Sequence, residues 1–261
     1  MKWLGRILVA FLIVGGVFYF IRPPEVTQTT ARTQVERQIE NDEDQMTRQQ
    51  RIERLFHFQE KVETALRKRV PPSDYVASQN ISKNLRVALV ATEDKRFYEH
   101  GPIDAFGIMR AFYINTVAGE TLEGGSTITQ QLVKTLFLSA KRILSRKIEE
   151  AILATMMEHY YDKEEILAMY LNTVYYGHNF YGIKAASYGY FGVDPKELTL
   201  AQAAMLAGMP QAPNYYDPYE NMKGAKNRQA TVLTLMMDQG LITKAQAEAA
   251  MREPLKLKEG N

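Results

Sequence analysis

The longest apolar run of the chain lies at its N-terminus, where residues 7–21 carry no charge and are rich in Leu, Ile, Val and Phe. With the apolar residues before Arg6, the stretch reaches the ~20 residues that span a bilayer as a helix. It ends in bulky residues 17–20 rather than in a small-residue cleavage site, which favours a retained anchor over a signal peptide. We therefore expect a transmembrane anchor over residues 1–22, with the N-terminus in the cytoplasm and the bulk of the chain outside.

Polar and charged residues dominate the next segment, residues 23–70. Pro23 and Pro24 end the membrane helix, because proline cannot continue it. Apolar positions return only in the second half, so we expect a charged stalk that becomes an ordered helix near Thr47. The main domain is expected over residues 71–261.

The rest of the chain has the periodicity of successive helices, and alternating strand patterns are scarce. Four capping boxes, each a side-chain oxygen followed three residues later by Glu or Gln, predict helix starts. They are Thr127 with Gln130, Asp162 with Glu165, Thr199 with Gln202, and Thr243 with Gln246. The sequence therefore predicts a domain that is all-α, or nearly so.

Composition narrows the function classes only slightly. The 261 residues carry a formal net charge of +2, which does not point to nucleic acid. There is no cysteine, which excludes disulfides and thiolate metal sites. The four histidines do not form an HExxH or comparable pattern, which argues against a histidine zinc site.

The first candidate for chemistry is the pair Glu93–Asp94, which follows the apolar helical run 85–90. A helix C-terminus disfavours negative charge, and such a placement would raise a carboxylate pKa, as a general acid or base requires. The ordinary alternative is an exposed acidic helix end that pairs with Lys95 or Arg96.

The second candidate is the Gly124–Lys134 segment, a glycine turn followed by a capped helix. Free N–H groups at a helix N-terminus suit phosphate, and Thr127, Gln131 and Lys134 form one polar stripe. The alternative is an amphipathic helix with a solvated face.

The third candidate is a cationic stretch before and within a long helix that runs to about Tyr160. Glu150 lies four residues after Arg146 and three after Lys147, so the three side chains share one helix face, and Arg142 lies just upstream. A pyrophosphate site and a pair of surface salt bridges both fit this pattern. Two carboxylates are the usual groups of glycosyl chemistry, and cations beside them favour a phosphate leaving group over simple hydrolysis.

Five motifs in order resemble those of the family 51 peptidoglycan glycosyltransferases, from about Lys83 to about Thr243. They are Ala91–Asp94 through Phe97 and His100, Gly124–Gln131, Arg146–Lys147 with Glu150, Ile166–Leu167 through Tyr170–Asn172, and Ala203–Pro210 with Pro213. Two positions depart from the family pattern: Pro102 replaces a glycine after His100, and Ala168 replaces a glutamate before Tyr170.

The resemblance implies a lysozyme-like globular lobe and a smaller hydrophobic lobe, around residues 106–117, that dips into the membrane. It implies an inverting transfer between lipid-linked glycan and lipid II, with Glu93 as the general base. Glu150 is implied as the second essential glutamate, and its role as acid, orienting group or metal contact stays open. The implied substrate-binding residues are Asp94, Phe97, His100, Ser126, Thr127, Gln130, Gln131, Lys134, Arg142, Arg146, Lys147 and Asn172.

A divalent cation, Mg²⁺ in the first place, is expected to assist, and no ligand set is fixed beyond the neighbourhood of Glu150. The expected partners are lipid-linked substrates, the membrane, and other cell-wall synthesis or division proteins. Two alternatives remain open at this point. One is a muramidase, which the cationic cluster disfavours because cleavage of a finished glycan releases no pyrophosphate. The other is a non-catalytic scaffold that binds lipid II, which retention of Glu93 and Glu150 disfavours.

Overall fold

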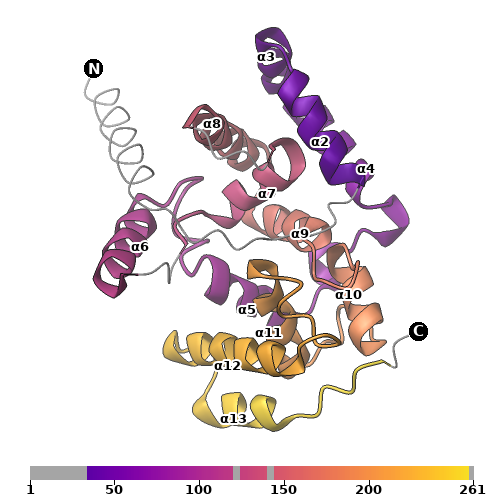
Figure 1. The fold of residues 1–261 in the computed structure, drawn as a ribbon, viewed down its shortest axis with the longest axis vertical. Coiled ribbons are helices and arrows are strands. Elements are labelled where there is room, and N and C mark those ends of the chain that lie inside the picture. Colours follow the sequence, from indigo (N-terminus) through magenta and orange to yellow (C-terminus); the bar gives the residue numbers. More distant parts are fainter. Residues whose placement is uncertain (1–33, 120–123, 140–143, 259–261) are drawn as a thin grey trace.

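The structure, a computed structural model, describes residues 34–119, 124–139 and 144–258. Within these residues the architecture is helical, and the only β-structure is an isolated antiparallel bridge between Tyr175 and Tyr181 (Figure 1). The α-helices are α2 (Gln34–Gln45), α3 (Arg48–Phe56), α4 (Phe58–Arg69), α5 (Lys83–Glu93), α6 (Ala105–Ala118), α7 (Ile128–Phe137), α8 (Leu144–Tyr160), α9 (Lys163–Thr173), α10 (Gly182–Phe191), α11 (Leu200–Gly208), α12 (Met222–Asp238) and α13 (Lys244–Arg252). Three short 3₁₀ helices join them: η1 (Pro72–Asp74), η2 (Ser78–Asn80) and η3 (Met209–Gln211). The prediction of an all-α protein is confirmed for the described part.

All four predicted capping boxes are present, at the starts of α7, α9, α11 and α13. In each box the side-chain oxygen accepts a hydrogen bond from the third backbone N–H of the helix, and the Glu or Gln side chain accepts one from the backbone of the cap. A fifth box, Thr47 with Gln50, begins α3, so a helix starts near Thr47 as expected, although helical structure already begins in α2 at Gln34.

The N-terminal helices are continuous with the domain rather than separate from it. Phe58, Val62 and Ala65 of α4 are buried in the same core as α7 and α9, because their spacing places them on one helix face. The expected boundary at residue 71 stays a prediction. The expected anchor lies outside the described residues; among those described, no helix is both long and apolar enough to cross a bilayer.

Two groups of helices build the core. Helix α11 packs against α5 and α12, and helix α7 packs against α8 and α9. The small residues of α11 permit this close packing, since Ala201–Gly208 are all buried. A Cβ on Gly208 would lie 2.7 Å from Arg228 Cγ, so glycine at the end of α11 allows α12 to approach. Glu93 at the end of α5 and Gln131 on α7 come from these two groups and meet through a hydrogen bond.

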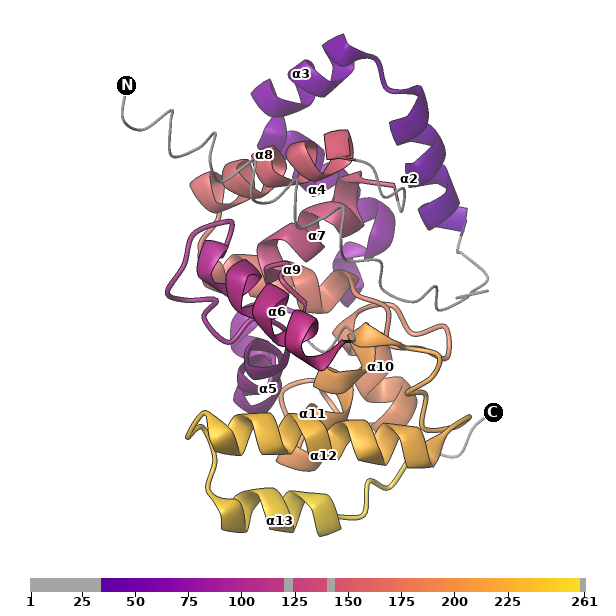
Figure 2. The same ribbon diagram turned by 60° about the vertical axis from the view of Figure 1, so that its left-hand side comes forward.

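Helix α6 stands apart from the other helices at the left of Figure 1, and in Figure 2, with that side turned forward, it lies in front of them. Arg96 holds its start: the guanidinium lies 4.9 Å from the centre of the Phe106 ring and contacts Asp104. Exposed apolar side chains lie on α6 and two residues upstream of it: Ile103, Phe106, Met109, Phe112, Tyr113 and Val117. The helix therefore leaves a large apolar face without partner among the described residues.

Candidate active site

Glu93 is the last residue of α5, and its carboxylate faces α7. Gln131 Nε2 donates a hydrogen bond of 3.0 Å to Glu93 Oε2, and Gln131 Oε1 accepts one of 3.0 Å from the Tyr170 hydroxyl. The surrounding protein raises the pKa of Glu93 because burial disfavours the charged carboxylate. The hydrogen bond from Gln131 and the nearby charges of Arg228 and Lys134 act in the opposite direction. We call Glu93, Gln131 and Tyr170 the Glu93 group.

The raised pKa of Glu93 has another main cause than the one predicted from the sequence. The prediction was that the negative end of the helix dipole raises this pKa, whereas burial is the largest cause in the structure. The Glu93 side chain is nevertheless only half-buried. A carboxyl that dense protein surrounds but that solvent still reaches is suited to exchange a proton with a bound hydroxyl.

Asp94 holds the end of α5 against the start of α7. Its Oδ2 accepts a hydrogen bond of 3.1 Å from the backbone N–H of Ile128, one of the free donors at the helix N-terminus. Its Oδ1 lies 2.7 Å from His100 Nε2. Thr127 Oγ1 in turn donates a hydrogen bond of 2.9 Å to the carbonyl of Pro102. The proline that departs from the family pattern thus contributes to the frame that places Gln131 beside Glu93.

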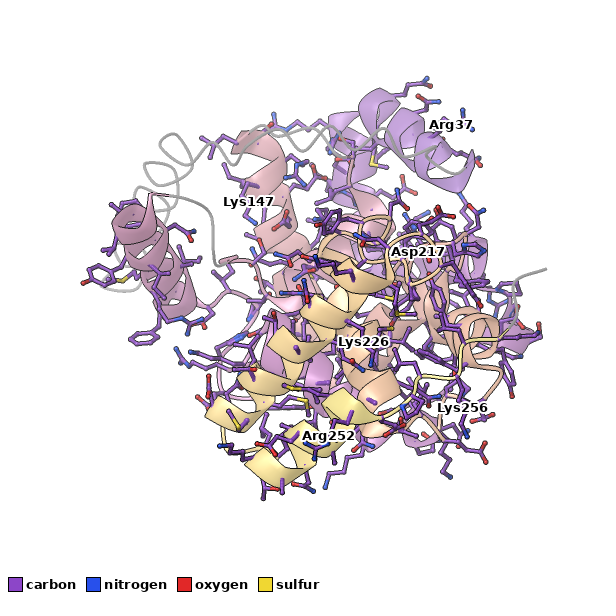
Figure 3. The ribbon with its side chains drawn as sticks, turned by 60° about the horizontal axis from the view of Figure 1, so that its bottom comes forward. Arg37, Lys147, Asp217, Lys226, Arg252 and Lys256 are labelled. Carbon is purple, nitrogen blue, oxygen red and sulfur yellow. The ribbon has the colours of Figure 1, made fainter. Side chains whose placement is uncertain are left out.

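The second carboxylate lies on α8 within a set of polar side chains. Glu150, 2% exposed, pairs with Lys147 Nζ and lies 3.4 Å from Arg146 Nη1. Lys147 Nζ also donates a hydrogen bond of 3.2 Å to Ser126 Oγ in the glycine turn before α7. We call Ser126, Arg146, Lys147 and Glu150 the Glu150 cluster. Figure 3 labels Lys147 on α8, far from Lys226 and Arg252 on α12 and α13.

Lys134 on α7 interacts electrostatically with both the Glu93 group and the Glu150 cluster. Its ammonium is influenced by the charges of Glu150, Arg146 and Lys147 and also by that of Glu93. The protein around it lowers the pKa of its ammonium because burial disfavours the charged form, although the side chain keeps an exposed surface. The structure therefore brings the two candidate carboxylates into one electrostatic neighbourhood.

Three expected binding residues have their contacts elsewhere. Phe97 is fully buried in the core, with Lys163 Nζ 4.6 Å from its ring centre. Gln130 is the buried partner of Thr127 in the capping box. Asn172 uses its amide on Val76 and on the Ala168 carbonyl, in three hydrogen bonds of 2.8 Å. These contacts stabilise the fold around the site, and a substrate contact by these residues stays a prediction. Arg142 lies outside the described residues.

Two residues join the site that the sequence analysis did not assign to it. Tyr170 belongs to a recognised motif, but nothing in the sequence shows that its hydroxyl reaches Gln131 on another helix. Arg228 on α12 contributes positive charge near Glu93, donates a hydrogen bond of 3.2 Å to the Gly208 carbonyl and lies over the Tyr216 ring. No local pattern marks Arg228, because its proximity to Glu93 comes from the packing of α12.

The described residues do not by themselves form a metal site. They contain no group of three His, Asp or Glu side chains able to hold an ion. The one carboxylate expected near a metal, Glu150, already pairs with two cations. Mg²⁺ is commonly held by one or two carboxylates together with substrate phosphates, so a site near Glu150 would depend on the substrate's own phosphates.

The fold and the site define a helical protein with two carboxylates that both interact electrostatically with Lys134: Glu93, whose pKa is raised, and Glu150, which is paired with cations. A family model described as "Transglycosylase" matches residues 59–237. The chain is 45% identical over 187 residues to penicillin-binding protein 1A of Aquifex aeolicus, covering 72% of this chain and 26% of the relative. It is 46% identical over 182 residues to penicillin-binding protein 1F of Bacillus subtilis, covering 70% and 26%. It is 35% identical over 266 residues to penicillin-binding protein 1A of Vibrio cholerae, covering 98% and 30%.

The chain belongs to the transglycosylase family, since the family model covers more than half of it. It spans between about a quarter and a third of the length of the curated relatives described above. A crystal structure of penicillin-binding protein 1A from Haemophilus influenzae is 38% identical but covers 38% of this chain and 15% of its own, with a TM-score of 0.36. This partial superposition adds nothing to the description of the fold.

Proposed function

We propose that this chain polymerises the glycan strands of peptidoglycan. It transfers a growing lipid-linked glycan onto the 4-hydroxyl of lipid II and releases polyprenyl pyrophosphate. Family membership supports a transglycosylase, and one observation carries the proposal. Glu93, a carboxylate of raised pKa, and Glu150, a cation-paired carboxylate, both interact electrostatically with Lys134.

Glu93 serves as the general base in this proposal. One of its oxygens is held by Gln131, which leaves the other available for the acceptor hydroxyl. As the acceptor oxygen attacks the donor's anomeric carbon, its proton passes to Glu93. A raised pKa makes the carboxylate a better proton acceptor at neutral pH, provided that enough of it stays ionised. Gln131, Lys134 and Arg228 favour that ionised form.

The Glu150 cluster and Lys134 bind the leaving pyrophosphate. The new bond joins the anomeric carbon to the acceptor oxygen from the face opposite the old carbon–pyrophosphate bond, so the anomeric configuration inverts. The bond electrons leave with the pyrophosphate, and nearby cations stabilise that growing negative charge. Arg146 lies 3.4 Å from Glu150 through Nη1, and its planar guanidinium suits bidentate phosphate contacts.

The lipid tails of both substrates call for a membrane beside the site. The apolar face of α6 fits such a surface, because exposed aromatic and aliphatic side chains partition into the lipid interface. In the proposed arrangement residues 1–22 anchor the chain in the bacterial cytoplasmic membrane, with the N-terminus in the cytoplasm. A lysozyme-like lobe acts at the outer surface, α6 belongs to the membrane-facing lobe, and Mg²⁺ assists through the substrate's pyrophosphate.

The test compares lipid II polymerisation by the wild-type chain, Glu93→Gln and the control Glu99→Gln in detergent with Mg²⁺. Glu99 is exposed and pairs only with Arg96 among the described residues, so Glu99→Gln removes the same charge as Glu93→Gln but outside the Glu93 group. We expect long glycan products from the wild type and the control, and a loss of about 10²–10⁴-fold in Glu93→Gln. A folded wild type that binds lipid II without forming product would refute the proposal and favour a scaffold. Clearing of purified cell walls would favour a muramidase.

A further inference from the structure

Four charged side chains from three helices form an ion-pair network behind the Glu150 cluster. Arg51 and Arg54 on α3 both pair with Glu149 on α8, and Arg51 also lies 3.2 Å from Glu43 on α2. The side chains of Arg54 and Glu43 are 4% and 5% exposed, and that of Glu149 is 19% exposed. Charged residues this deeply buried are uncommon unless they are paired.

The network holds helices α7 and α8, which carry the proposed pyrophosphate-binding residues. Glu43 Oε2 accepts a hydrogen bond of 2.5 Å from the backbone N–H of Ser139, just beyond the end of α7. Arg54 Nη1 donates one of 3.5 Å to the Phe137 carbonyl in the last turn of that helix. On α8 the contact point is Glu149, the direct neighbour of Glu150.

Neighbouring helix positions explain how one helix serves both sets of contacts. Consecutive residues of an α-helix point ~100° apart, so Glu149 faces α3 while Glu150 faces Lys147. With side-chain atoms ~5–6 Å from the helix axis, a rotation of α8 by about 20° would move the Lys147 ammonium by roughly 2 Å. That displacement would separate it from Ser126 Oγ, which is 3.2 Å away.

We propose that Arg54 and Glu149 are positioning residues, which fix the rotation of α8 and thereby the anion-binding geometry of the Glu150 cluster. Buried ion pairs contribute little net stability compared with apolar residues of similar size, but their two-ended contacts fix geometry. The guanidinium groups of Arg51 and Arg54 hold both oxygens of Glu149, a constraint on rotation that apolar packing lacks. This inference rests on the proposed function, because it assigns the network to the pyrophosphate end of that site.

The experiment uses the full chain in detergent and compares the wild type with Arg54→Met, Arg54→Lys and Glu149→Gln. Arg67→Met is the matched control, because Arg67 makes an exposed ion pair with Glu63 on the neighbouring α4. Two experiments are made well below the unfolding temperature of each variant: binding of inorganic pyrophosphate, which gives Kd, and the kinetics of lipid II polymerisation, which give kcat and KM. Misplacing a binding group by ~1 Å can cost about 10²-fold in rate, so a loss of at least tenfold is expected.

We expect Arg54→Met and Glu149→Gln to weaken pyrophosphate binding at least tenfold and to lower kcat/KM by a similar factor. Arg54→Lys should give intermediate values of Kd and kcat/KM, since it keeps the positive charge but loses the planar guanidinium with its paired N–H groups. The control should match the wild type. A folded Glu149→Gln with unchanged pyrophosphate Kd and unchanged kcat/KM would overturn the inference. That outcome would assign the network to stability alone.

The two measurements separate this inference from the proposed function. If the wild type does not polymerise, the proposed function fails, and the pyrophosphate Kd still decides whether the network positions the cluster. If Arg54→Met fails to fold, Glu149→Gln decides, because Glu149 is the less buried partner.

Discussion

Replacing Gln131 with methionine tests how the Glu93 carboxylate is kept ionised within its buried surroundings. The substitution preserves the length of the side chain and removes the 3.0 Å hydrogen bond from Gln131 Nε2 to Glu93 Oε2. That bond favours the ionised form, whereas burial favours the neutral form and remains in place. Loss of the bond therefore raises the pKa of Glu93 further.

The size of the shift follows from the energy of one charge-assisted hydrogen bond. Such a bond contributes ~1.5–3 kcal/mol, and one pKa unit corresponds to about 1.4 kcal/mol. Solvent reaches part of the Glu93 side chain and replaces some of the lost interaction, so we take the lower end of the range, a shift of about one unit. The rate that depends on ionised Glu93 rises with pH through this pKa. Its acid limb should therefore move to higher pH by about one unit.

The assay is the pH profile of kcat/KM for lipid II polymerisation at constant ionic strength. Gln246→Met is the matched control, since Gln246 is an exposed glutamine in the capping box of α13. Tyr170→Phe should give a smaller shift in the same direction, because its hydroxyl only orients the Gln131 amide. An active Gln131→Met variant whose acid limb coincides with that of the wild type would refute the assigned hydrogen-bond role.

Four further predictions concern stability and anion binding. Glu93→Gln should unfold at a higher temperature than the wild type at about pH 8 and at the same temperature at about pH 4. The raised pKa of Glu93 means that its carboxyl stabilises the fold only when protonated, below the ordinary pKa of a glutamate, and this contribution is lost as the pH rises. Equal unfolding midpoints at both pH values would contradict this. Asn172→Ala should lower the free energy of unfolding by about 2–3 kcal/mol in chemical denaturation and leave pyrophosphate affinity unchanged, since the amide contacts only backbone atoms. Lys147→Met should weaken pyrophosphate binding and flatten its salt dependence in calorimetry, whereas unchanged binding would remove Lys147 from the anion site. Chelation with EDTA should slow polymerisation without shifting the unfolding midpoint, and a shifted midpoint would reveal a structural metal.

The helices could be predicted from the sequence because their signals are local. A capping box is complete within four residues, so all four predicted boxes are found where they were expected. The pairing of Glu150 with Arg146 and Lys147 is equally local, since residues three and four apart share a helix face. Motif order then associated Glu93 with Gln131, which the structure joins by a hydrogen bond.

Contacts between distant segments could not be predicted in this way. A substrate contact of Asp94 stays a prediction, and its contacts with the backbone N–H of Ile128 and with His100 had no signal in the sequence. Arg228 gains its place near Glu93 only because α11 ends in a glycine that lets α12 approach. The partners of Arg54 are more than 80 residues away along the chain, so no window of sequence could have revealed them.

The unpartnered apolar face of α6 has a practical consequence for every kinetic constant measured on this protein. Detergent molecules will cover Phe106, Met109 and Tyr113 just as membrane lipids would, and this applies equally to a shortened chain without residues 1–33. Under the proposed function, micelles would then compete with the substrate's own lipid tail for this surface. Apparent KM values will therefore vary with detergent type and concentration, and values from lipid nanodiscs will differ from both.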